Sequence, residues 1–95
     1  MDIKKLENLL DLETQITEKE ELYDNTKIEL ETLEADYILL NDWESLLGKA
    51  KPTQKEKDSY ITKETDLRKR NLKRLERELK HLKRMYDIYM VDAKH

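Results

Sequence analysis

Residues 48–56 read GKAKPTQKE, and the strongest local signals of the chain lie in this stretch. Gly48 is the only glycine, and it stands where a helical pattern of apolar residues stops. This is the place at which a glycine commonly closes a helix in the left-handed conformation. Pro52 prevents that helix from simply continuing. Thr53 and Glu56 have the spacing of a capping box, in which the hydroxyl accepts from one amide and the carboxylate reaches back to the other. The stretch therefore predicts the end of one helix, a turn and the start of a second helix.

Apolar side chains recur at heptad spacing on both sides of this turn. They predict a first helix over about residues 3–47 and a second helix over about residues 54–93, joined by a turn at about residues 48–53. Because a connection of about five residues favours antiparallel neighbours, the two helices should fold back on each other. We therefore expect an all-α chain in which residues 1–95 form a single antiparallel two-helix hairpin with coiled-coil packing.

The two predicted helices should meet along a seam of heptad-spaced residues. Lys19 and Thr26 interrupt the seam in the first helix, and we interpret them as polar residues that set the register of the pairing. The antiparallel register should bring Leu33 near Arg68. The predicted seam consists of Leu9, Leu12, Ile16, Tyr23, Leu30, Leu33, Tyr37, Leu40, Ile61, Leu72, Leu75, Leu79, Leu82, Tyr86 and Tyr89.

The composition of the 95 residues also favours long helices. Charged residues make up 43% of the chain and apolar residues 37%, with one proline and no phenylalanine, which is typical of coiled coils. Two helices alone cannot surround a wide apolar stripe, so we expect the hairpin to pair with itself as a homodimer, a four-helix bundle. The residues that widen the stripe are Leu6, Leu10, Leu22, Ile28, Leu46, Leu47, Leu67, Met85 and Ile88.

Charge is divided unevenly between the two halves of the chain. Residues 1–48 hold 14 acidic and 4 basic side chains, a net charge of −10, whereas residues 49–95 hold 8 acidic and 15 basic side chains, a net charge of +7. Complementary arms favour the hairpin over parallel pairing of identical arms. A basic face of the second helix should nevertheless point away from the seam; it consists of Arg70, Lys73, Arg74, Arg77, Lys80, His81 and Arg84.

This basic face has several interpretations. It is either a solvated surface or a partner-binding surface that meets an acidic protein or nucleoprotein, the acidic arm of a second molecule, or the phosphates of a nucleic acid. The acidic first arm would repel a nucleic acid unless it were shielded. Trp43 has two interpretations as well, burial at the tip of the hairpin or service as an anchor for a partner, since tryptophan is enriched among residues that dominate binding energy.

The motifs of catalysis and cofactor binding are missing from the sequence. No cysteine is present, and the pair Glu78 and His81 has helical metal-ligand spacing but lies among cations that oppose metal binding. There is no phosphate-binding glycine loop and no nucleophile beside a base. We expect no enzymatic activity, no cofactor and no small-molecule substrate. Apolar runs are far shorter than the roughly 20 residues of a membrane span, so we expect a cytoplasmic protein without membrane contact.

The start of the second helix carries a resemblance to a known group of proteins. A leucine-rich first helix with many Glu and Lys residues, followed by KEKDSYI at residues 55–61, is similar to small coiled-coil early-region proteins of phages and prophages of low-GC Gram-positive bacteria. The resemblance implies a role in binding a partner, such as a host or defence nucleoprotein. The leading expectation is thus a protein–protein interaction module. The alternatives are a nucleic-acid-binding protein that uses the basic face, and a structural coiled-coil spacer or scaffold.

Overall fold

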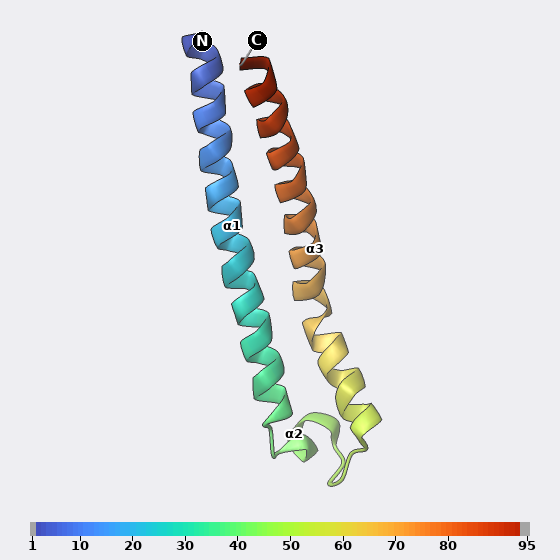
Figure 1. The fold of residues 1–95 in the computed structure, drawn as a ribbon. Helices are drawn as coiled ribbons and strands as arrows, with labels where there is room; N and C mark the ends of the chain where they lie inside the picture. Colours follow the sequence, from blue (N-terminus) through green and yellow to red (C-terminus); the bar gives the residue numbers. More distant parts are fainter. Residues whose placement is uncertain (1, 94–95) are drawn as a thin grey trace.

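A computed structural model describes residues 2–93 and contains three helices, α1 (Ile3–Ile38), α2 (Trp43–Leu47) and α3 (Gln54–Ala93). The long helices α1 and α3 are antiparallel neighbours, so the start of α1 and the end of α3 lie at the same end of the molecule (Figure 1). The hairpin measures 68 × 16 × 13 Å, and no strand occurs in the described residues. The expected all-α hairpin is confirmed; residues 1, 94 and 95 of the expected domain lie outside the described range.

The first helix ends earlier than the sequence predicted, at Ile38 instead of about residue 47. The chain leaves the helix after Leu39, and Asp42 then caps the short helix α2. The Asp42 carboxylate accepts from the Ser45 amide at 3.4 Å and from the Ser45 hydroxyl at 2.7 Å. A helix that continued through Asp42 would lose this cap, which typically contributes about 1 kcal/mol. The prediction that the first helix extends to about residue 47 is therefore wrong beyond Ile38.

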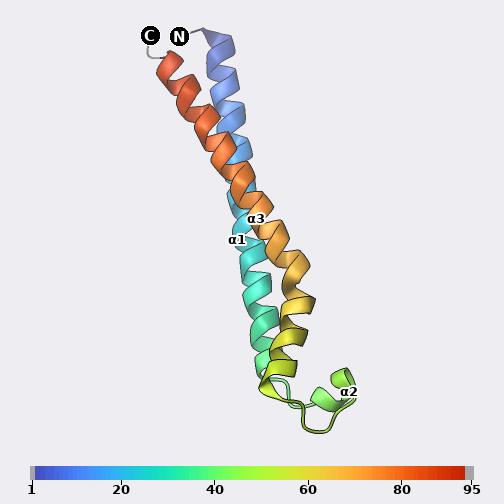
Figure 2. The ribbon, with the colours of Figure 1, turned by 90° about the vertical axis from the view of Figure 1, so that its right-hand side faces the viewer.

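The turn after α2 carries the features that the local sequence predicts. Gly48 closes α2 in the left-handed conformation, with φ 70° and ψ 15°, and its amide donates to the Glu44 carbonyl at 2.8 Å. At the start of α3 the Glu56 amide donates to Thr53 Oγ1 at 3.2 Å. The end of α2 and the start of α3 together reverse the direction of the chain. The short helix α2 lies to one side of the tip in the turned view (Figure 2).

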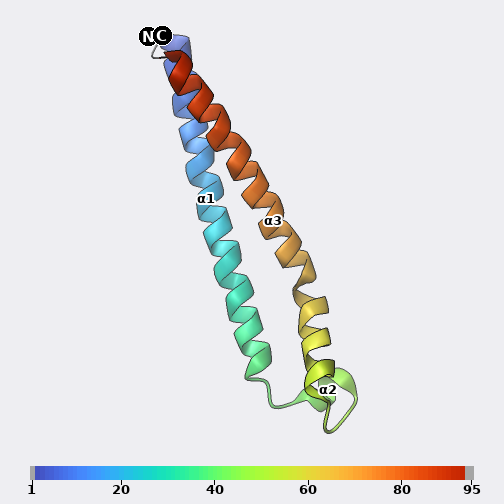
Figure 3. The ribbon, with the colours of Figure 1, turned by 45° about the vertical axis from the view of Figure 1, so that its right-hand side comes forward.

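The apolar core is a single layer between α1 and α3. None of the predicted seam residues is exposed. The two arms are inclined to each other and overlap in the turned views (Figures 2 and 3). The buried residues of the long helices are Leu9, Leu12, Leu30, Thr65, Leu75, Leu79 and Leu82.

Ion pairs between the arms mark the antiparallel register. Their atoms lie 3.2 Å apart for Lys5 with Asp92, 3.2 Å for Lys83 with Glu20, and 3.5 Å for Lys69 with Glu34. In the same register Leu33 and Arg68 line one surface depression, as the sequence predicted. Each pair joins an acidic and a basic side chain of opposite arms. In the order given, the first pair lies near the open end of the hairpin, the second near its middle and the third closer to the tip. In two of these pairs, Lys83 with Glu20 and Lys69 with Glu34, the base comes from α3 and the acid from α1, so the charge division of the sequence contributes to the register at those positions.

Candidate partner-binding surface

All seven residues of the predicted basic face are exposed on α3. Their position follows from helical geometry, because at about 100° per residue they lie opposite the leucines that pack against α1. Leu75, Leu79 and Leu82 are buried on the seam side of the same helix segment. The basic face therefore points outward from the hairpin, away from the acidic arm.

Three members of the basic face form ion pairs within α3. Arg70 Nε lies 2.9 Å from an oxygen of Asp66, Lys80 Nζ lies 3.7 Å from Glu76, and Arg74 Nε lies 3.9 Å from Glu78. Each of these contacts is solvent-exposed and spaced by one helical turn, so each contributes only a few tenths of a kcal/mol, about 0.3–0.5.

The four remaining members form no ion pair with any other residue in the described range 2–93. Lys73, Arg77, His81 and Arg84 follow one another at spacings of three or four residues, and we call this row the basic stripe. At about 1.5 Å per residue it extends over roughly 17 Å of the helix. Three of its members, Lys73, Arg77 and Arg84, are cationic, and they have no ion-pair partner among the described residues.

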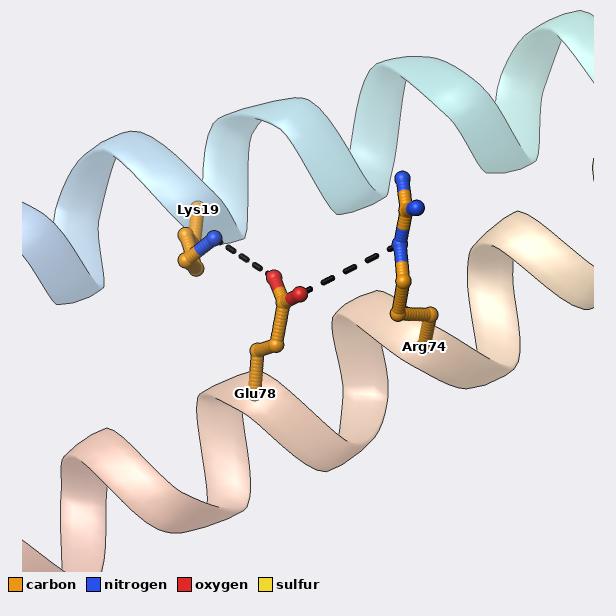
Figure 4. Close-up of polar contacts among 3 residues, drawn as sticks. All are labelled: Lys19, Arg74 and Glu78. Carbon is orange, nitrogen blue, oxygen red and sulfur yellow. Dashed lines mark hydrogen bonds and ion pairs between the residues drawn. The ribbon is translucent and has the colours of Figure 1, made fainter.

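A polar contact divides the seam near its middle. Lys19 Nζ donates to Glu78 Oε2 at 2.6 Å, and Arg74 approaches the other oxygen of the same carboxylate (Figure 4). The hydrogen bond from Lys19 holds the pKa of Glu78 below its ordinary value, although partial burial opposes this shift. The sequence analysis named Glu78 only beside His81 and not as the partner of Lys19, across from which the antiparallel register places it. Thr26, the other polar seam residue, is half-buried.

Trp43 lies inside the tip. Only 6% of its surface is exposed, and its ring meets the Tyr60 ring edge-on at a centroid distance of 5.8 Å. Tyr37 completes the cluster at 5.6 Å from Tyr60, and Lys57 Nζ lies 5.7 Å from the centre of the Trp43 ring. Burial raises the pKa of Tyr60, and the neighbouring Glu64 charge raises it further. This geometry places Trp43 in the packing of the tip, whereas its interpretation as an anchor for a partner stays a prediction.

The residues expected to widen the apolar stripe are mostly uncovered by the hairpin. Leu47 and Met85 are half-buried, and the other members are exposed. The exposed side chains do not form one continuous band, because several lie on the outer sides of the helices and others near the ends. Further exposed apolar residues that the sequence analysis did not name are Ile3, Ile38, Leu39 and Val91.

The described residues contain no group of three or more metal-binding side chains. Neither long helix, over the part that the structure describes, combines the length and the apolar character of a membrane span. The depressions on the surface are shallow, and one of them is lined by α3 residues alone, namely Lys55, Asp58, Ser59, Thr62, Lys63 and Asp66.

Fold and surface together define a helical hairpin with a basic stripe on the outer side of its second arm. No protein-family model matches the chain, and comparisons with curated proteins and with solved structures give no match. What the protein does is therefore inferred from the geometry and charge of the hairpin itself.

Proposed function

We propose that the chain is a non-enzymatic protein-binding module that uses the basic face of α3 to bind an acidic surface of a macromolecular partner. The basic stripe carries this proposal, because its cationic groups are exposed and have no ion-pair partner among the described residues. Binding an acidic surface there breaks no internal ion pair. A row of like charges also attracts an oppositely charged partner over distances near the Debye length, about 8 Å at physiological salt.

The proposal includes self-association. Leu22 and Ile28 on α1, and Leu67 and Ile88 on α3, are each at least half exposed in the single hairpin. A second copy that covered such side chains would recover about 25 cal/mol for each Å² of apolar surface removed from water. A dimer of hairpins, with four long helices, is the simplest assembly that achieves this.

The resemblance of the chain as a whole to small coiled-coil early-region proteins of phages supports a bacterial nucleoprotein, of the host or of a defence system, as the acidic partner in the cytoplasm. A direct contact with nucleic acid is the second candidate. It is favoured by one observation: the basic stripe points away from α1, so the acidic arm does not cover it. A spacer role would instead use the 68 Å length of the hairpin and would depend on the number of heptads.

The test is affinity capture of partners by three versions of the chain, followed by mass spectrometry. Arg77→Glu with Arg84→Glu reverses the basic stripe, and Lys51→Glu with Lys55→Glu makes the same charge change near the turn, where both lysines are exposed and unpaired. We expect a partner that is retained by the parent chain and by the turn variant but lost by the stripe variant. Circular dichroism should show the same helix content in all three.

Two results would overturn the proposed function. Equal capture by the stripe variant and the parent chain would show that the basic stripe is merely solvated. Binding of DNA or RNA by the parent chain, falling steeply with salt and lost in the stripe variant, would replace the acidic protein partner by nucleic acid.

A further inference from the structure

The outer side of α1 carries its own row of charges, opposite in sign to the basic stripe. Helical geometry places six acidic residues on the side of α1 that points away from the seam. All six are exposed, and none forms an ion pair with another described residue. We call this row the acidic stripe; it consists of Glu7, Asp11, Glu18, Glu21, Asp24 and Glu31.

We infer that a second copy of this chain is a partner of the basic face, with the acidic stripe of one hairpin bound to the basic stripe of another. The inference rests on the proposed function, because it names an occupant for the same surface. Within one hairpin the two stripes point in opposite directions, so they cannot meet. Between two hairpins they can, and the contact between α1 of one copy and α3 of the other is the only pairing of outer sides that brings opposite charges together.

The dimensions of the stripes agree with this contact. At about 1.5 Å per residue the acidic stripe extends over roughly 36 Å and the basic stripe over roughly 17 Å. The basic stripe therefore fits within the acidic one. Contacts between two acidic stripes or two basic stripes are opposed by like-charge repulsion, which directs the association toward unlike arms.

Apolar side chains lie beside both stripes. Ile28, 60% exposed, stands on the outer side of α1 among the acidic residues. Leu67 and Ile88, 69% and 61% exposed, flank the two ends of the basic stripe on α3. A contact between the outer sides of unlike arms removes these three side chains from water while it pairs the charges, so hydrophobic burial and charge complementarity favour the same arrangement.

Self-association and the binding of another acidic partner then compete for one surface. In each such contact the basic stripe of one hairpin is covered by the acidic stripe of the other, and it becomes available when the two copies dissociate. A strongly binding acidic partner should therefore lower the mean mass of the hairpin assembly as it binds.

Two charge-reversed variants test this arrangement by sedimentation equilibrium at low salt. The first carries Glu18→Lys and Glu21→Lys on α1, and the second carries Arg77→Glu and Arg84→Glu on α3. Each variant alone places like charges opposite each other at the substituted positions of the contact between unlike arms, so its self-association should weaken by at least about tenfold. In an equimolar mixture, contacts between one variant and the other restore opposite charges at the substituted positions, so association absent from either variant alone should return. Lys51→Glu with Lys55→Glu should associate like the parent.

The inference is overturned if the parent chain has the mass of a single hairpin, 11.5 kDa, at all concentrations and at low salt. It is also overturned if the two variants associate like the parent, or if mixing them restores nothing. The proposed function is judged separately, by partner capture. A hairpin that stays single but loses its captured partner in the Arg77 and Arg84 variant would refute self-association and leave standing the binding of another acidic partner by the basic face.

Discussion

Replacing Trp43 by alanine tests whether the tip is held by its aromatic cluster. The tryptophan is 94% removed from solvent, because only 6% of its surface is exposed, and it contacts Tyr37 and Tyr60. A tryptophan side chain buries about 200 Å², which at about 25 cal/mol per Å² sets an upper limit near 5 kcal/mol. Measured costs of replacing buried aromatic residues by alanine, about 3–5 kcal/mol, lie in the same range. We expect Trp43→Ala to lower the free energy of unfolding by about 3 kcal/mol.

The assay is urea unfolding followed by circular dichroism, with two control variants. Trp43→Phe keeps an aromatic ring in the cluster and should lose less than half as much stability as Trp43→Ala. Leu39→Ala removes an apolar side chain from the same region, but one that is 76% exposed, and should change stability by less than about 0.5 kcal/mol.

Fluorescence of the parent chain provides an independent check, because Trp43 is its only tryptophan. Burial predicts blue-shifted emission and weak quenching by iodide. A loss below about 1 kcal/mol in Trp43→Ala, or quenching equal to that of a free tryptophan, would refute the packing of the tip described here.

Three further predictions concern the seam, the charges and the turn. Glu78→Gln should lower the midpoint of urea unfolding, with a smaller difference at high salt, whereas replacing Lys19 and Glu78 together by leucine should leave stability equal or higher. The pKa values of Glu56 and Glu78 are lowered by hydrogen bonds from Lys49 and Lys19, so their stabilisation is present above the ordinary value of 4.5 and is lost as the pH falls through the lowered values. Acid titration of the parent chain should show this loss, and Glu56→Gln with Glu78→Gln should reduce it. Gly48→Ala should cost about 1 kcal/mol through its φ of 70° alone, because no atom lies within 4 Å of the added methyl group; a change near zero in thermal unfolding would contradict this.

Local signals were sufficient to predict the reversal of the chain. A glycine at the end of one apolar pattern and the capping box at Thr53 depend on a few neighbouring residues, and the structure shows Gly48 and Thr53 in these conformations. The outward direction of the basic face follows from helical periodicity in the same way, because it requires only the position of the seam.

The features that the sequence analysis missed depend on contacts between distant residues. The apolar pattern continues through Leu40, Leu46 and Leu47, so it does not indicate that the first helix ends before α2. The one sign of this break in the sequence is the cap residue Asp42. Packing of Trp43 against Tyr60, which lies beyond the turn, makes that break favourable. The residues of the acidic stripe are present in the sequence. The register of the two arms is needed to distinguish them from the acidic residues that form ion pairs across the seam.

The seam, the tip cluster and the two charged stripes all depend on the two arms lying side by side. Because the chain has no cysteine, Ile3→Cys and Val91→Cys, both at exposed positions, accept a donor and an acceptor dye without competing sites. Energy transfer within single chains, measured with an excess of unlabelled protein, should be nearly complete, since neighbouring helix axes lie about 8–10 Å apart. Energy transfer near zero would contradict the hairpin, because one unbroken helix would separate the dyes by about 130 Å.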